Sequence, residues 1–113
     1  MKILIADSNP ERLDLYKRIL EGDDHEILTA KDRLGVSIAY KRHKIDVVVL
    51  DLKMPDNIER LVQLYGTPIV AISDSKEKEL EAFSKTNFTI RRYNEDALKY
   101  AVRAVGNLEL AVA

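Results

Sequence analysis

Polar side chains that could do chemistry follow short apolar runs at four places in the chain. Magnesium prefers hard oxygen ligands such as carboxylates, and a second carboxylate can act as a nucleophile that forms an acyl phosphate. A hydroxyl group and a cation can hold the added phosphoryl oxygens. Such groups at one sheet edge would form a site for magnesium and phosphoryl transfer. The four places are Asp7-Ser8, Asp51, Ser73-Asp74 and Arg91-Arg92.

The segment from Ile45 to Pro55 supplies the central carboxylate. Residues 45–50 are β-branched or aliphatic except for Asp46, which is typical of a strand buried on both faces, as in parallel sheets. Asp51 follows this strand, and Pro55 forces a turn soon after. Ligands of open α/β sheets bind just beyond the carboxyl ends of strands. The simpler alternative is that Asp51 only ends its strand.

Five such strands alternate with five helices along the chain. This alternation predicts a parallel sheet with right-handed crossovers and helices on both faces. A dinucleotide-binding fold would need a glycine fingerprint after the first strand, and residues 7–10 contain no glycine. We therefore predict a flavodoxin-like, doubly wound α/β fold with five strands in the order 2-1-3-4-5, which places Asp7 opposite Asp51. The expected strands are 2–6, 26–30, 45–50, 69–72 and 88–90. The expected helices are one that follows Ser8 and stops at Gly22, then 34–41, 58–65 and 76–84, and a last one that starts at Asn94 or Glu95.

Local patterns add expectations about single residues. Ser8 has the spacing of a capping-box residue for the first helix, and Arg12 falls on the solvent side of that helix. Leu34, Ile38 and Ala39 are expected to face the core. Gly22, Gly66 and Gly106 are expected to end helices. The tail from about residue 107 is left unassigned within a single domain, 1–113.

Composition narrows the classes of protein. The chain has 18 basic and 19 acidic residues and no cysteine. A nearly balanced charge gives no basic face for direct nucleic-acid binding, and no apolar run reaches transmembrane length. The short apolar start before Asp7 does not fit a signal peptide. A domain of this size can fold without disulfides, which fits a reducing compartment. We therefore expect a cytoplasmic protein without a membrane contact.

Three segments together resemble the receiver domain of two-component response regulators, over nearly the whole chain. They are the stretch from Lys2 to Pro10, the stretch from Asp46 to Pro55, and the stretch from Pro68 to Ser73. The resemblance implies a phosphorelay in which a histidine kinase or phosphotransfer protein phosphorylates the domain. The roles that it implies are phosphoacceptor for Asp51, magnesium ligands for Asp7, Asp51 and the backbone carbonyl of Lys53, switch hydroxyl for Ser73 and aromatic switch for Phe88.

The resemblance also implies an output by switching. Aspartyl phosphate would draw Ser73 inward and shift the face around the fourth helix and fifth strand. That face would bind a downstream protein or output domain, or form a homodimer, with Tyr93, Tyr100 and Val102 as interface candidates. No separate substrate is turned over, so the domain is not expected to be an enzyme.

The chain departs from the receiver pattern inside the site. Ser8 stands where the family has a second acid, so magnesium binding should be weak. Asp74 stands where a small residue is usual, and Arg91-Arg92 replaces a lysine and proline. Arg91 could bind phosphate or form a salt bridge with a buried carboxylate, whereas Arg92 should face solvent.

Two functions therefore remain open. One is a receiver phosphorylated on Asp51. The alternative is a phosphorylation-independent pseudo-receiver that acts as a protein-interaction module. An aspartyl phosphatase is disfavoured because Lys53 occupies the place of its second acid, and a flavin site is disfavoured because Asp7 would repel phosphate.

Overall fold

The computed structural model describes residues 1–55, 57–73, 88–91 and 95–112, and of residues 88–91 and 106–112 it describes the backbone. Strands and helices alternate up to residue 73, as expected. The helix expected over 76–84 lies outside the described residues. In chain order the elements are β1 (Lys2–Ala6), α1 (Pro10–Glu21), β2 (Glu26–Ala30), α2 (Arg33–Arg42), β3 (Val47–Asp51), α3 (Ile58–Leu64), β4 (Ile69–Ser73), β5 (Phe88–Arg91) and α5 (Glu95–Val112).

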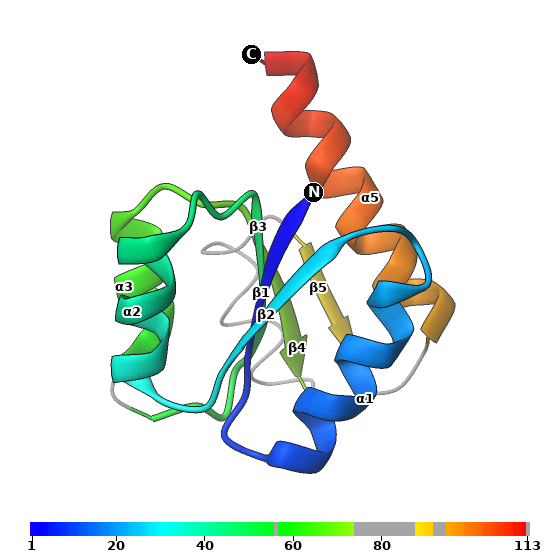
Figure 1. The fold of residues 1–113 in the computed structure, drawn as a ribbon. Coiled ribbons are helices and arrows are strands. Elements are labelled where there is room, and N and C mark those ends of the chain that lie inside the picture. Colours follow the sequence, from blue (N-terminus) through cyan, green and yellow to red (C-terminus); the bar gives the residue numbers. More distant parts are fainter. Residues whose placement is uncertain (56, 74–87, 92–94, 113) are drawn as a thin grey trace.

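Strands β1 to β4 belong to one parallel sheet, in which β1 pairs with β2 and β3, and β3 pairs with β4. Helices α1 and α5 cover one face of the sheet, and α2 and α3 cover the other (Figure 1). The prediction of a doubly wound, flavodoxin-like parallel fold is confirmed for β1 to β4 and their helices. The pairing that matters for the site joins β1 to β3, with Ala6 opposite Leu50.

Each central strand contributes to two cores because successive side chains point to opposite faces. Ile3, Ile5 and Val49 pack toward α1 and α5, where they meet residues such as Leu98 and Val102. The intervening residues of the same strands pack toward α2 and α3; they include Leu4, Ala6, Val48 and Leu50. This double burial explains why the strands are almost uninterrupted apolar runs. Val102 is completely buried, so it cannot be an interface residue.

Helix α2 buries only one of the three side chains that were predicted to face the core, Ala39. Val36 and Ala39 are buried, whereas Leu34 and Ile38 are 69% and 40% exposed. The prediction for these two side chains was therefore wrong. A β-carbon added at Gly35 would lie 3.2 Å from the Ala30 β-carbon, so the missing side chain lets the helix approach β2 on this side.

The three glycines that were predicted to end helices behave differently. Gly22 is the C-cap of α1, as predicted. Gly66, just after α3, has a φ of 71°, the left-handed conformation in which glycine commonly follows a helix. Gly106 lies inside α5, which continues to Val112. The prediction that Gly106 ends this helix was wrong. A glycine in helical backbone costs only about 1 kcal/mol relative to alanine, and without a left-handed turn it does not stop the helix.

Candidate functional site

Two buried carboxylates lie side by side where β1 and β3 end. Asp7 directly follows β1, and Asp51 is the last residue of β3. Since Ala6 pairs with Leu50, the next residue along each strand falls at the same edge of the sheet. The two aspartates are only 1% and 2% exposed. The structure thus brings these carboxylates together, and their negative charges need a compensating partner.

That partner is Arg12, which the sequence pattern placed on the solvent side of α1. Its Nε atom lies 2.8 Å from Oδ2 of Asp7, and its Nη2 donates to Oδ1 of the same carboxylate at 3.0 Å. The same Nε is 3.5 Å from Oδ2 of Asp51. Two parallel N–H donors on one carboxylate form the strong, bidentate type of charge-assisted pair. The solvent-side prediction for Arg12 was wrong.

The turn between β1 and α1 explains why Arg12 reaches back into the site. Asn9, rather than Ser8, caps the helix, and its Oδ1 accepts the N–H groups of Glu11 and Arg12 at 2.9 and 3.1 Å. The backbone N–H of Asn9 in turn donates to Oδ1 of Asp7 at 2.9 Å. Ser8 is exposed. The predicted cap at Ser8 was wrong by one residue, and that shift places Arg12 in the first turn, above the end of β1.

The electrostatics of Asp7 follow from these contacts. Burial raises the pKa of Asp7, but hydrogen bonds from the Arg12 side chain and the Asn9 N–H outweigh burial, so the pKa lies below its usual value. The hydrogen bond to Asp7 is the main reason that the pKa of Arg12 is raised. Asp7 and Arg12 therefore form a stable ion pair of opposite charges.

The chain just after β3 holds Asp51 in place. The Lys53 N–H donates to Oδ1 of Asp51 at 2.7 Å, and the Met54 N–H donates to the Asp51 carbonyl at 3.1 Å. These bonds close a tight turn around the carboxylate. The predicted metal ligand at Lys53, its carbonyl oxygen, belongs to this same turn.

Ser73 lies at the same sheet edge, one strand further along. It is the last residue of β4 and is 1% exposed. Asp51 pairs with Ile72, so Ser73 stands one residue beyond the aspartate in the register, and it pairs with Arg91 of β5. The roles expected of the Phe88 and Arg91 side chains stay predictions, and Asp74, Arg92 and Tyr93 lie outside the described residues.

A resident divalent cation does not fit this arrangement. Within the described part of the chain, no group of three or more histidine, cysteine, aspartate or glutamate side chains could hold a metal ion. Ser8 brings no charge, and both oxygens of Asp7 already accept hydrogen bonds from Arg12. A hard cation such as Mg²⁺ needs those oxygens as ligands. Arg12 would have to leave before the metal could bind.

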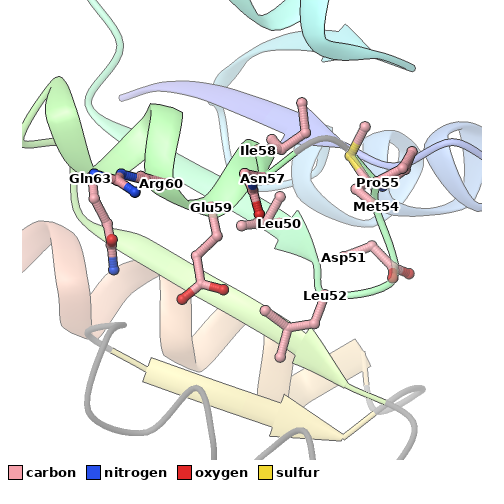
Figure 2. A pocket seen from close by; sticks show the side chains of 10 residues that line it. All are labelled: Leu50, Asp51, Leu52, Met54, Pro55, Asn57, Ile58, Glu59, Arg60 and Gln63. Atoms are coloured by element: carbon pink, nitrogen blue, oxygen red, sulfur yellow. The ribbon is translucent and has the colours of Figure 1, made fainter.

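A cleft of about 630 Å³ opens beside Asp51, between the end of β3 and α3. Asp51 lies at one end of this cleft, and Arg60 and Gln63 lie at the other (Figure 2). Among the described residues, Oε1 of Glu59 is buried in this region without a hydrogen-bond partner. The cleft was not foreseen from the sequence, because its walls come from residues 50–63 that were interpreted only as a strand end and a helix.

Sequence comparisons find a response regulator and a methylesterase among the relatives of the chain. No family model matches the chain. It is 33% identical over 76 residues to the response regulator GtcR of Aneurinibacillus migulanus, covering 63% of this chain and 31% of that protein. It is 31% identical over 88 residues to a protein-glutamate methylesterase/protein-glutamine glutaminase of Rhizobium etli, covering 72% of this chain and 25% of that protein. The matches thus span a third or less of these relatives.

Solved structures share the fold at lower identity. A response regulator receiver domain protein from Clostridium thermocellum superposes with a TM-score of 0.88 at 24% identity, covering 99% of this chain and 98% of the other. The response regulator TrrA from Thermotoga maritima, solved in complex with Mg(2+)-BeF, gives a TM-score of 0.79 at 21% identity, covering 92% and 97% of the two chains. In addition, no described helix is both long and apolar enough to cross a membrane.

Proposed function

The chain is a receiver domain of the response-regulator family, and from this premise we propose that it accepts a phosphoryl group on Asp51. The observation that carries the proposal is the placement of this carboxylate. Asp51 is 2% exposed at the end of β3, with Asp7 and a cation beside it. Desolvated, oriented carboxylates next to positive charge are suited to phosphoryl chemistry.

The proposed step is a substitution at phosphorus. An Asp51 oxygen attacks the phosphorus atom of the donor, and the bond from phosphorus to the donor's nitrogen or oxygen breaks. The leaving group keeps the electron pair, and Asp51 becomes an acyl phosphate. Ser73 at the end of β4, and Arg91 opposite it in the register, are proposed to hold the new phosphoryl oxygens.

The proposal extends to partners and to the switching face. A histidine kinase or phosphotransfer protein would donate the phosphoryl group, and a downstream protein, an output domain or a second copy would sense the change. We also propose that β5 is the edge strand of a five-stranded sheet in the order 2-1-3-4-5, and that Phe88 is the aromatic switch. Magnesium binding by Asp7, Asp51 and the Lys53 carbonyl stays a prediction that requires Arg12 to move.

One observation favours the second candidate, a pseudo-receiver that binds partners without phosphorylation. Arg12 pairs with Asp7 at 2.8 Å and approaches Asp51 at 3.5 Å. A site whose charges are already compensated in this way gains less from binding a metal or a phosphoryl group. In that case the face around β4 and β5 would bind its partner without switching between two states.

Intact-mass spectrometry after incubation with a small acyl phosphate distinguishes the two candidates. The wild type and Asp51→Asn are compared, with Asp14→Asn as a control because Asp14 is an exposed aspartate of α1. We expect one added phosphoryl group in the wild type and in Asp14→Asn, and none in Asp51→Asn. No addition to the wild type, with or without magnesium, would favour the pseudo-receiver.

A further inference from the structure

We propose that the guanidinium group of Arg12 takes the place of the divalent cation in this site and competes with Mg²⁺ for Asp7 and Asp51. The inference rests on the proposed function only in treating this sheet edge as a phosphoryl-acceptor site. The contacts that carry it exist before any phosphorylation. They are the bidentate pair with Asp7 and the 3.5 Å approach of Arg12 Nε to Asp51 Oδ2.

The first argument is the charge of the site. Two buried carboxylates carry two negative charges, and Arg12 supplies one positive charge between them. Ser8, exposed and neutral, adds no further anion. Mg²⁺ added beside a retained Arg12 would give three positive charges against two negative ones. With Arg12 alone the two carboxylates keep one net negative charge, with Mg²⁺ alone they are neutral, and with both cations the site carries one net positive charge. Binding Mg²⁺ beside a retained Arg12 therefore forces two cations together over the same two acids, so each cation disfavours the other.

The second argument is that both cations need the same atoms. Arg12 uses both oxygens of Asp7, and a magnesium ion would need at least one of them at close range. A guanidinium is planar, with its N–H groups in a rigid fork that matches a carboxylate, and it remains charged at all ordinary pH values. It is thus a permanent substitute for the charge of a metal, although it cannot bring coordinated water.

The third argument is that the chain pre-positions Arg12. Its own N–H is fixed by the Asn9 cap, and its side chain is 19% exposed. The same Asn9 binds Asp7 through its backbone N–H. Cap, carboxylate and guanidinium therefore form one closed unit at the start of α1. The cap fixes the backbone of Arg12, and the planar guanidinium loses little side-chain entropy for each hydrogen bond that it forms with the acids.

One consequence concerns the receiver chemistry. A phosphoryl group on Asp51 would meet a cation that belongs to the chain, because Arg12 Nε already faces Asp51 Oδ2. The charge that stabilises the site would then not vary with the concentration of free magnesium. This sets the domain apart from one whose phosphorylation requires a bound metal.

Calorimetric titration of the purified chain with MgCl₂ tests the inference. The variants are Arg12→Met and Arg12→Gln, the second keeping an amide donor in case the first does not fold. Arg18→Met is the matched control, since Arg18 lies on the same helix in an exposed pair with Asp14. We expect both Arg12 variants to bind Mg²⁺ at least about tenfold more tightly than the wild type, and Arg18→Met to behave as the wild type.

Thermal unfolding provides a second readout. In a chelator, Arg12→Gln should melt at a lower temperature than the wild type, and millimolar Mg²⁺ should restore part of the loss while leaving the wild type unchanged. Equal Mg²⁺ affinity in the wild type and the Arg12 variants would overturn the proposal. So would the absence of binding in all of them, because Arg12 would then not be what keeps the metal out.

The outcome is separable from that of the phosphorylation assay because no phosphodonor is present. Gain of Mg²⁺ binding in the Arg12 variants, together with an Asp51 that takes no phosphoryl group, would remove the proposed function and keep this inference. Phosphorylation of Asp51 with no gain of Mg²⁺ binding would do the reverse.

Discussion

Replacing Arg12 by methionine should destabilise the domain strongly. Asp7 and Asp51 are 1% and 2% exposed, and removal of their cation leaves two adjacent buried carboxylates. Removing one partner of a buried pair typically costs about 3–5 kcal/mol. Because the Arg12 side chain is 19% exposed, water can partly replace it, and we expect the lower end, about 3 kcal/mol. That is a large part of the stability of an ordinary domain, about 5–15 kcal/mol.

Urea unfolding followed by far-UV circular dichroism measures this loss, since the chain has no tryptophan. With a slope of about 1.5 kcal/mol per molar urea, the midpoint should fall by about 2 M. Arg18→Met is again the control. Arg18 pairs with Asp14, but these side chains are 69% and 66% exposed, so its loss should cost no more than about 1 kcal/mol.

A double-mutant cycle isolates the pair. Asp7→Asn removes one charge and one strong acceptor, and Asp7→Asn combined with Arg12→Met removes both members. The combined loss should be smaller than the sum of the single losses by about 1–3 kcal/mol, as for residues in one buried network. If Arg12→Met costs no more than Arg18→Met, or if the single losses simply add, the ion pair does not hold the site together and our reasoning fails.

Three further predictions concern the elements around the site. Asn9→Ala should lower the free energy of unfolding by about 1 kcal/mol because it removes the cap of α1, whereas Ser8→Ala should change it by no more than about 0.5 kcal/mol; thermal melts of both variants compare them directly. Gly66→Ala should cost about 1–2 kcal/mol in urea unfolding because Gly66 has a φ of 71°, and Gly22→Ala, with a φ of −62°, should not show this cost. Burial lowers the pKa of His25 in the folded chain, so the unfolded chain binds this proton at a higher pH than the folded chain does. Stability should therefore fall as the pH drops below about 6.5, and the fall should end below the pKa of His25 in the folded chain. Thermal melts of His25→Gln over the same pH range should not show this fall.

The fold and the two carboxylates could be predicted because they depend on short-range patterns. A strand buried on both faces must be almost wholly apolar, as in Val47–Asp51, and its first charged residue therefore marks the end of the strand. The carboxyl ends of two adjacent parallel strands lie next to each other at the same edge of the sheet. No packing detail is needed to place Asp7 beside Asp51.

The buried face of a helix was harder to predict than the fold, because a helical pattern gives only the positions of the side chains relative to one another. In α2 the apolar residues Leu34 and Ile38 lie one turn apart, as do Val36 and Ala39, and only the close approach at Gly35 decides which pair is buried. That approach depends on Ala30 of β2, five residues earlier in the chain. The sequence pattern contains no signal for it.

Arg12 was missed for a related reason. An arginine among Glu11, Asp14, Lys17 and Arg18 fits a solvated helix face, and the cap at Asn9 rather than Ser8 decides which way the first turn points. A signal was nevertheless available. Two buried carboxylates require a cation, and Arg12 is the first basic residue after Asp7. A search for the charge partner of the acids would have reached it.

Ser8 and Arg12 are best understood as one change in the charge of the site. With an acid at residue 8, three carboxylates would face a cation, and a divalent metal would balance them better than a guanidinium. With serine there, one guanidinium leaves the two remaining carboxylates with one net negative charge instead of two, and it binds Asp7 twice and approaches Asp51 once. The loss of an acid and the inward turn of an arginine thus compensate each other. It follows that Ser8→Asp alone should leave Arg12 in place, whereas Ser8→Asp with Arg12→Gln should bind Mg²⁺ more tightly than either single variant.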